Sequence, residues 1–232
     1  MGSDMMDVDQ LAAYLRRDAR EVGKLASRGR LPGHKVGGEW RFARAEINRW
    51  LESQMPGYTD EQLTVFEEAR GGTAEPLLAN LLSPACVAVP LAASTKASVL
   101  REMVKLAEES WEIYDPEAIF EAVRAREELV STALPTGVAF PHPRRPLSAA
   151  LGESVLAFGR TASGVPYGDP NGGLTDCFFL ICCKDDHTHL RVLARLTRLL
   201  LRDGFLAELR AGETPAEAYD VITAAEQDLL NS

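Results

Sequence analysis

The residue in this sequence best suited to chemistry is His142, which stands between Pro141 and Pro143 directly after a short apolar segment. Each proline fixes its own φ angle and pushes the residue before it toward an extended conformation, so the imidazole is held on a stiff loop after a predicted strand. A neutral imidazole is a nucleophile, and its attack on a phosphoryl group gives a phosphohistidine that can be passed on. The alternative is a turn histidine whose ring bonds a backbone carbonyl and does no chemistry.

A second histidine, His189, is predicted to lie in the first turn of a helix that begins at Thr188. Phosphoryl transfer depends on positioning and on donors that stabilise charge on the equatorial oxygens. The first turn of a helix offers backbone N–H groups for this purpose, so His189 is the natural partner of His142. The alternative is that His189 and the nearby His187 face the solvent.

The motifs around these histidines resemble one family, the enzyme IIA domain of the bacterial phosphoenolpyruvate-dependent phosphotransferase system, of the fructose/mannitol and nitrogen-regulatory type. Members carry an arginine–glutamate pair, a Ser-Thr pair, a Gly-aliphatic-Ala-apolar-Pro-His core and a later Thr-His-Leu. These motifs stand here in order at 126–127, 131–132, 137–142 and 188–190. The resemblance implies a site formed by His142, His189, Arg126 and Thr132. Otherwise Arg126 is a last-turn helix cation and Thr132 a turn former.

The resemblance also implies a phosphoryl donor, which is a histidine phosphocarrier protein, and it requires no metal or cofactor. It implies an α/β domain in which a mixed sheet is flanked by helices. The alternation of predicted elements agrees with that class. Helices are predicted at 96–110, 116–128, 188–202 and 215–230, and strands at 138–140, 155–159 and 176–183.

Charge is divided unevenly along the chain. The whole sequence has a formal net charge of −9, yet residues 1–51 hold ten basic and seven acidic side chains, a net +3, so the remainder carries −12. Phosphate backbones attract a basic surface and are repelled by an acidic one. The two parts of the chain are therefore predicted to have different partners.

Residues 1–54 are predicted to form a small winged helix-turn-helix domain. Val8, Leu11 and Leu15 share one face of a first helix, Asp18 caps a second at 19–28, and a third follows at 43–51. A Gly-Gly hairpin turn lies between the last two helices. The pattern resembles the excisionase/MerR-like family, whose Gly-x-Leu-Pro, Val-Gly-Gly, Trp-Arg-Phe and Trp-Leu motifs stand here at 29–32, 36–38, 40–42 and 50–51.

That resemblance implies that the second helix enters a major groove of DNA while the wing follows the backbone. The predicted DNA-binding residues are therefore Arg20, Lys24 and Arg28 of the helix, with Lys35 and Arg41 of the wing. Glu21 departs from the family pattern and would repel phosphate at this surface. The family usually reads palindromic or repeated sites, so a homodimer is expected. The alternative is an interaction module whose basic residues form a solvated face.

Residues 55–76 are predicted to be a linker with a short polar helix and a flexible break at 71–76, followed by the second domain at 77–232. No apolar run approaches the ~20 residues of a membrane span, and the start lacks a signal region, so we expect a cytoplasmic protein without membrane insertion. The four cysteines lack the spacing of a zinc site and are predicted to lie in the core. A redox role for the adjacent Cys182 and Cys183 is the alternative.

These observations predict a regulator linked to the phosphotransferase system. Phosphorylation of His142 adds about −1.5 to −2 charges to the acidic domain, which changes how it docks on the basic DNA-binding domain or on another regulated protein. One alternative is a phosphocarrier that hands its phosphoryl group to a sugar permease component, with the N-terminal domain as a protein-docking module. Another is a degenerate domain that binds partners without being phosphorylated.

Overall fold

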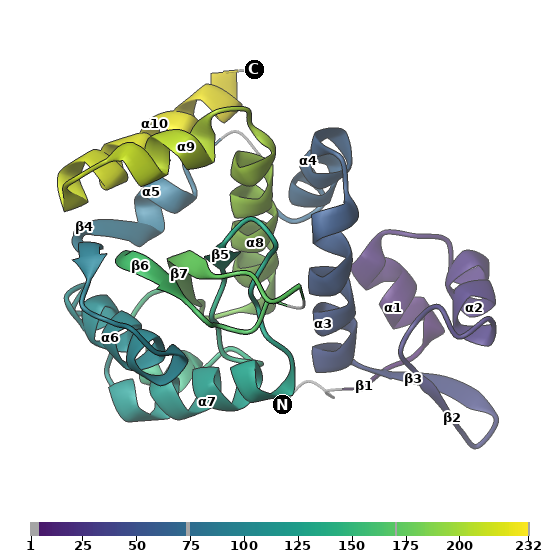
Figure 1. The fold of residues 1–232 in the computed structure, drawn as a ribbon. Helices are drawn as coiled ribbons and strands as arrows, with labels where there is room; N and C mark the ends of the chain where they lie inside the picture. Colours follow the sequence, from purple (N-terminus) through teal and green to yellow (C-terminus); the bar gives the residue numbers. More distant parts are fainter. Residues whose placement is uncertain (1–4, 73–74, 170, 232) are drawn as a thin grey trace. The chain divides into compact units, whose positions relative to one another are not determined.

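The computed structural model describes residues 5–72, 75–169 and 171–231. The chain divides into two compact units, Met1–Thr59 and Asp60–Ser232 (Figure 1). Each unit has a sheet of its own, with strand order β1-β3-β2 in the first and β4-β6-β7-β5 in the second.

The first unit is a helix-turn-helix followed by a hairpin and a further helix. Asp7 and Asp18 cap the first two helices through their side chains, as expected of aspartate at this position. Gly37 and Gly38 have φ angles of 61° and 89°, which suits a two-residue hairpin turn. The elements are β1 (Met5–Met6), α1 (Val8–Leu15), α2 (Ala19–Ser27), β2 (His34–Val36), β3 (Glu39–Ala43), α3 (Arg44–Gln54) and the 3-10 turn η1 (Met55–Gly57).

The second unit is an α/β domain with a mixed sheet, which confirms the predicted fold class. β6 runs antiparallel to β7, whereas β4 pairs with β6 and β5 pairs with β7 in parallel. The elements are α4 (Asp60–Glu68), α5 (Leu78–Leu81), β4 (Leu82–Leu91), α6 (Lys96–Glu108), α7 (Pro116–Leu129), β5 (Val138–Ala139), η2 (Ser148–Ala150), β6 (Val155–Val165), β7 (Thr175–Cys182), α8 (Asp186–Leu201), α9 (Phe205–Ala211) and α10 (Pro215–Asn231).

Helices cover both faces of this sheet. A Cβ atom added to Gly159 in β6 would lie 2.6 Å from the Sδ atom of Met103 in α6. The next residue, Arg160, donates from Nη1 to the carbonyl oxygen of Leu209 in α9 at 3.2 Å. Neighbouring residues of a strand point to opposite faces, so α6 and α9 lie on opposite sides of the sheet. Figure 1 shows α7 beside α6 and α10 beside α9.

Helix α4 belongs to the second unit because buried ion pairs join it to α8. The guanidinium of Arg195 is fully buried and donates from Nη2 to Glu67 Oε2 at 2.6 Å and from Nη1 to Glu226 Oε1 at 2.8 Å. Arg198 donates to Asp60 at 2.8 Å. Part of the segment predicted as a linker is thus a helix fixed to the second unit, while Thr73 and Ala74 of the predicted break lie outside the described residues. Glu226 also accepts the backbone N–H groups of Leu77, Leu78 and Ala79.

Strand β4 was not predicted, because Pro84 and Pro90 interrupt its sequence. Proline cannot donate to a strand ladder and is tolerated at the edges of sheets. β4 lies at the edge of the sheet, and both prolines are exposed there. In the part of the chain that the structure describes, no helix is long and apolar enough to cross a membrane.

Candidate functional site

His142 and His189 meet at one end of the sheet. Their ring centroids are 4.7 Å apart and the ring planes are inclined by 51°. His142 follows β5, where the N–H of Ile181 donates to the carbonyl of Pro141 at 3.0 Å and so extends the pairing with β7 toward the histidine. His189 lies in the first turn of α8. The structure therefore brings together two residues that are far apart in the sequence.

The imidazole of His142 has a defined orientation. Its Nδ1 atom lies 2.6 Å from the carbonyl oxygen of Phe140. A carbonyl oxygen only accepts hydrogen bonds, so Nδ1 carries the proton and Nε2 carries the lone pair of the neutral ring. The backbone contact that defines an inert turn histidine is thus present, but it also leaves Nε2 as the ring nitrogen with the free lone pair.

Helix α8 begins earlier than predicted, because Asp185 and not a later residue is its N-cap. The Asp185 carboxylate accepts the backbone N–H of Thr188 and the hydroxyl of Thr188, each at 2.8 Å. The predicted start at Thr188 is wrong by two residues, since α8 starts at Asp186. The N–H of Thr188 is consequently used by the cap and is not a donor for a phosphoryl group.

Arg126 lies on α7, and Thr132 lies on the segment that connects α7 to β5. An antiparallel bridge joins Ala133 to Ala139, which stands three residues before His142. Arg126 donates from Nη1 to the carbonyl of Val130 at 2.8 Å. The guanidinium of Arg126 is therefore held at the segment that pairs with the strand leading to His142.

Thr132 makes contacts that the sequence did not indicate. Its hydroxyl donates to Glu127 Oε2 at 2.7 Å, and its backbone N–H donates to Glu127 Oε1 at 2.9 Å. Glu127 is itself buried, with 2% of its surface exposed. The sequence signal for Glu127 was its place directly after Arg126 in the arginine–glutamate motif.

Comparison with known proteins shows the family of the chain. Residues 80–225 match the family described as the phosphoenolpyruvate-dependent sugar phosphotransferase system, EIIA 2. The chain belongs to this family. Residues 5–55 match a helix-turn-helix domain family. The chain is thus an EIIA domain of the fructose, mannitol and nitrogen-regulatory type preceded by a helix-turn-helix domain.

Its relatives include nitrogen regulatory proteins and a fructose-specific EIIABC component. The nitrogen regulatory protein of Bradyrhizobium diazoefficiens is 30% identical over 148 residues, which cover 62% of this chain and 94% of that protein. The fructose-specific EIIABC component of Bacillus subtilis is 29% identical over 147 residues, which cover 62% of this chain but only 23% of that protein. The crystal structure of nitrogen regulatory protein IIA-Ntr from Neisseria meningitidis has a TM-score of 0.56 and 25% identity, covering 63% of this chain and 99% of that one.

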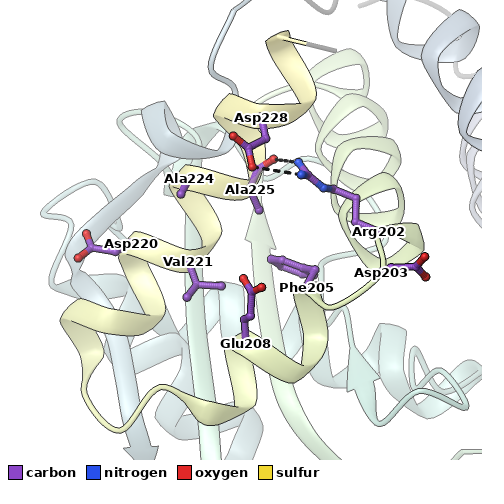
Figure 2. Close-up of a pocket in the computed structure, with 9 residues that line it drawn as sticks. All are labelled: Arg202, Asp203, Phe205, Glu208, Asp220, Val221, Ala224, Ala225 and Asp228. Atoms are coloured by element: carbon purple, nitrogen blue, oxygen red, sulfur yellow. Dashed lines mark hydrogen bonds and ion pairs between the residues drawn. The ribbon is translucent and has the colours of Figure 1, made fainter.

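A pocket of about 340 Å³ in the EIIA domain lies away from the histidines (Figure 2). Arg202, at the C-terminal end of α8, lines it, whereas His189 is in the first turn of that helix. Arg202 already donates to Asp228 and to the carbonyl of Ala225. Carboxylates on this lining repel a phosphoryl group, so the pocket does not suit the chemistry of the family. The other lining residues are Asp203, Phe205, Glu208, Asp220, Val221 and Ala224.

The predicted DNA-binding residues are found on α2 and on the hairpin. Arg20, Lys24 and Arg28 are exposed, with Arg28 directly after the last residue of α2. In the hairpin, the ammonium of Lys35 lies 5.5 Å from the centre of the Trp40 ring, and Arg41 pairs with Glu39. Because Glu39 offsets part of its charge, Arg41 attracts a DNA phosphate less strongly than Arg20, Lys24 and Arg28 do.

Glu21 is also less repulsive than the sequence suggested. Arg17 donates from Nη1 to Glu21 Oε1 at 2.8 Å, one turn apart on the surface. Such an exposed pair contributes little to stability, but it offsets the negative charge of Glu21 on the basic face of the domain.

Proposed function

We propose that this chain is a regulator linked to the phosphotransferase system, whose EIIA domain accepts a phosphoryl group on His142 and whose N-terminal domain binds DNA. The donor is a histidine phosphocarrier protein. The observation that carries the first half of this proposal is the pairing of His142 with His189 at the end of the sheet. Membership of the EIIA family supplies the reaction class.

The transfer moves one phosphoryl group between two imidazoles. Nε2 of His142 attacks the phosphorus, a new N–P bond forms, and the N–P bond to the histidine of the donor breaks with its electron pair returning to that ring. The proton on Nδ1 of His142 stays in place, hydrogen-bonded to the carbonyl oxygen of Phe140. His189 and Arg126 stabilise charge on the transferred group. Thr132 contributes indirectly, because it lies on the segment that also carries the Val130 carbonyl bonded by Arg126.

The surface next to the site suits a protein donor. Leu129 and Val130 are 53% and 62% exposed, although both are apolar. Leu129 is the last residue of α7, the helix that carries Arg126, and Val130 directly follows it. Exposed apolar side chains beside a site mark a surface for another protein more often than for a small anion.

Mass spectrometry tests the phosphoryl transfer. The intact protein is incubated with phosphoenolpyruvate and the two general phosphotransferase proteins, and we expect an acid-labile mass gain of one phosphoryl group. His142→Ala abolishes the gain. His187→Ala is the matched control, because His187 is an exposed histidine on the same helix as His189, and it retains the label. Absence of label on the wild type, with a donor shown to be active on another EIIA protein, contradicts the proposal.

DNA binding is supported by the match to a helix-turn-helix family and by the three exposed cations of α2. A phosphoryl group adds about −1.5 to −2 charges to an already acidic domain, so we propose that phosphorylation changes the DNA affinity of the intact chain. Fluorescence anisotropy with DNA from the neighbourhood of its own gene measures both states of the protein. Equal affinity of the phosphorylated and unphosphorylated chain contradicts the regulatory coupling.

A second candidate is a phosphocarrier that serves a sugar permease, with the N-terminal domain as a docking module. It is favoured by the similarity to a protein named as a fructose-specific EIIABC component. In membranes that contain a permease lacking its own EIIA domain, such a carrier restores phosphorylation of the sugar. A regulator does not, and this result separates the two candidates.

A further inference from the structure

We infer that Lys96 and Glu127 are positioning residues for phosphoryl transfer to His142. Glu127 is buried and Lys96 is partly exposed, and their ion pair holds the segment that bridges to the strand before the histidine. The inference rests on the proposed function, because it concerns the rate of that reaction. Neither residue touches the transferred group, and both act through Thr132 and through the carbonyl that Arg126 uses.

The Glu127 carboxylate contacts Thr132 and Lys96. Oε1 accepts the backbone N–H of Thr132 and lies 3.2 Å from the ammonium of Lys96, and Oε2 accepts the hydroxyl of Thr132. The carboxylate side chain is 1% exposed. A buried carboxylate is costly unless it is paired and hydrogen-bonded, and here two N–H or O–H donors and one cation meet it.

Lys96 reaches Glu127 from the first position of helix α6. It is the first residue of α6, after the Thr95 cap, and its ammonium also donates to the main-chain carbonyl of Glu127 at 3.4 Å. The same ammonium lies 5.0 Å from the centre of the Tyr167 ring. Lys96 thus contacts both the side chain and the backbone at the end of α7, and it supplies the positive charge that Glu127 needs.

The contacts of Glu127 and Arg126 converge on three consecutive residues. Arg126 bonds the carbonyl of Val130, and Glu127 bonds Thr132 through two groups. Arg126 and Glu127, which are adjacent in α7, therefore bind the two ends of the stretch 130–132. Ala133, the residue after Thr132, bridges to Ala139 on the strand that leads to His142. We therefore expect a shift of Thr132 to move this segment together with the Val130 carbonyl that orients the Arg126 guanidinium.

The ion pair acts from the opposite face of the sheet. Tyr167, next to Lys96, packs on Phe178 with ring centroids 5.1 Å apart, whereas Phe140, two residues before His142, packs on Phe179. Phe178 and Phe179 are neighbours in β7 and point to opposite faces. We therefore infer that the sheet lies between the ion pair and the phosphoryl group. The ion pair then acts on the site only through the segment 130–133.

A further contact holds the segment 130–133 against the backbone of residues 167–168. The hydroxyl of Ser131 donates to the carbonyl of Tyr167 at 3.3 Å. A Cβ atom added to Gly168 would lie 2.9 Å from Ser131 Oγ, and Gly168 has a φ angle of 119°. The backbone of residues 167–168 therefore approaches Ser131 closely, and the segment has little room to move once Glu127 holds Thr132.

Single-turnover labelling of five variants tests the inference: two break the ion pair, two are controls, and Lys96→Arg keeps the cation. Glu127→Gln and Lys96→Met break the pair, while Glu128→Gln and Lys105→Met are matched controls that change an exposed neighbour on the same two helices. The rate is measured against the concentration of the phosphorylated donor, which separates the maximal rate from the half-saturating concentration. Folding of each variant is checked by circular dichroism.

We expect both test variants to lower the maximal rate by about 10- to 100-fold, because misplacing a catalytic group by about 1 Å can cost 100-fold. The half-saturating concentration stays near that of the wild type, because the exposed docking residues are unchanged. Lys96→Arg restores most of the rate, since it keeps the cation. The controls react at the rate of the wild type.

Two outcomes overturn different claims. If the wild type is labelled and folded Glu127→Gln and Lys96→Met react at its rate, the positioning role is wrong while the proposed function stands. If the wild type is not labelled at all, the proposed function itself fails. Should Glu127→Gln not fold, Lys96→Met decides alone, because the lost side chain is 33% exposed and Glu127 keeps both of its hydrogen bonds from Thr132.

Discussion

Nδ1 of His142 lies 2.6 Å from the carbonyl oxygen of Phe140, which assigns the proton of the neutral ring to Nδ1. We therefore predict that the phosphoryl group is carried on Nε2. Protein labelled with 15N-histidine and phosphorylated enzymatically should show 31P coupling to the Nε2 resonance in NMR spectra. A phosphoryl group on Nδ1 would mean that the bond to Phe140 breaks before the reaction.

The four cysteines are predicted to be unreactive in the folded protein. All are buried, as the sequence predicted. Burial raises the pKa of the Cys86 thiol to about 11 and those of Cys177 and Cys182 to about 12, and it also raises the pKa of Cys183. Because the thiolate is the reactive form, a thiol reagent at pH 8 should label none of the four until denaturant is added. Rapid labelling of the native protein at Cys182 or Cys183 would support the redox alternative.

The residues that could be predicted from the sequence are those with a local physical signal. Prolines around His142 define a stiff loop, and Asp115 before Pro116 marks the start of α7. The apolar run from Phe178 is typical of a buried strand, and it forms most of β7. Each signal lies within a few residues of the element that it predicts.

The remainder depends on contacts between distant segments. The sequence gives no sign that Arg195 bonds Glu67 and Glu226, since the three residues lie on different helices. It also cannot reveal that Glu127 bonds Thr132 instead of facing solvent, because a carboxylate on a helix is usually exposed. Strand β4 was missed for a similar reason: its prolines are acceptable only because its place is at the edge of the sheet.

DNA binding through α2 predicts a change in salt dependence. Lys24→Ala removes one exposed cation, so it should lower the affinity for DNA of any sequence and reduce the slope of log K against log salt by about 1. The measurement is an anisotropy titration at several salt concentrations. Lys105→Ala, an exposed lysine on α6, is the control and should leave the slope unchanged. Equal slopes for Lys24→Ala and the wild type would show that α2 does not contact phosphates.

Arg195 is predicted to be essential for the stability of the second unit. It is fully buried and donates to both Glu67 and Glu226, so Arg195→Met removes from two buried carboxylates the cation that pairs with both. Breaking a buried ion pair from one side costs about 3–5 kcal/mol of unfolding free energy. The matched control is Arg202→Met on the same helix, whose partner Asp228 is 65% exposed, and it should cost less than about 1 kcal/mol.

The free energy of unfolding lost in Arg195→Met should also depend on pH. Burial raises the pKa of Glu67 above its ordinary value even though Arg195 opposes this shift. A carboxyl whose pKa is raised by folding favours the folded state below its ordinary pKa, and this contribution is lost as the pH rises through the raised value. Removing Arg195 raises the pKa of Glu67 further, so the destabilisation should grow as the pH rises above 4.5, the ordinary pKa of a glutamate. Urea unfolding at several pH values measures it, and a loss equal to that of Arg202→Met at every pH would show that the buried pairs do not stabilise the unit.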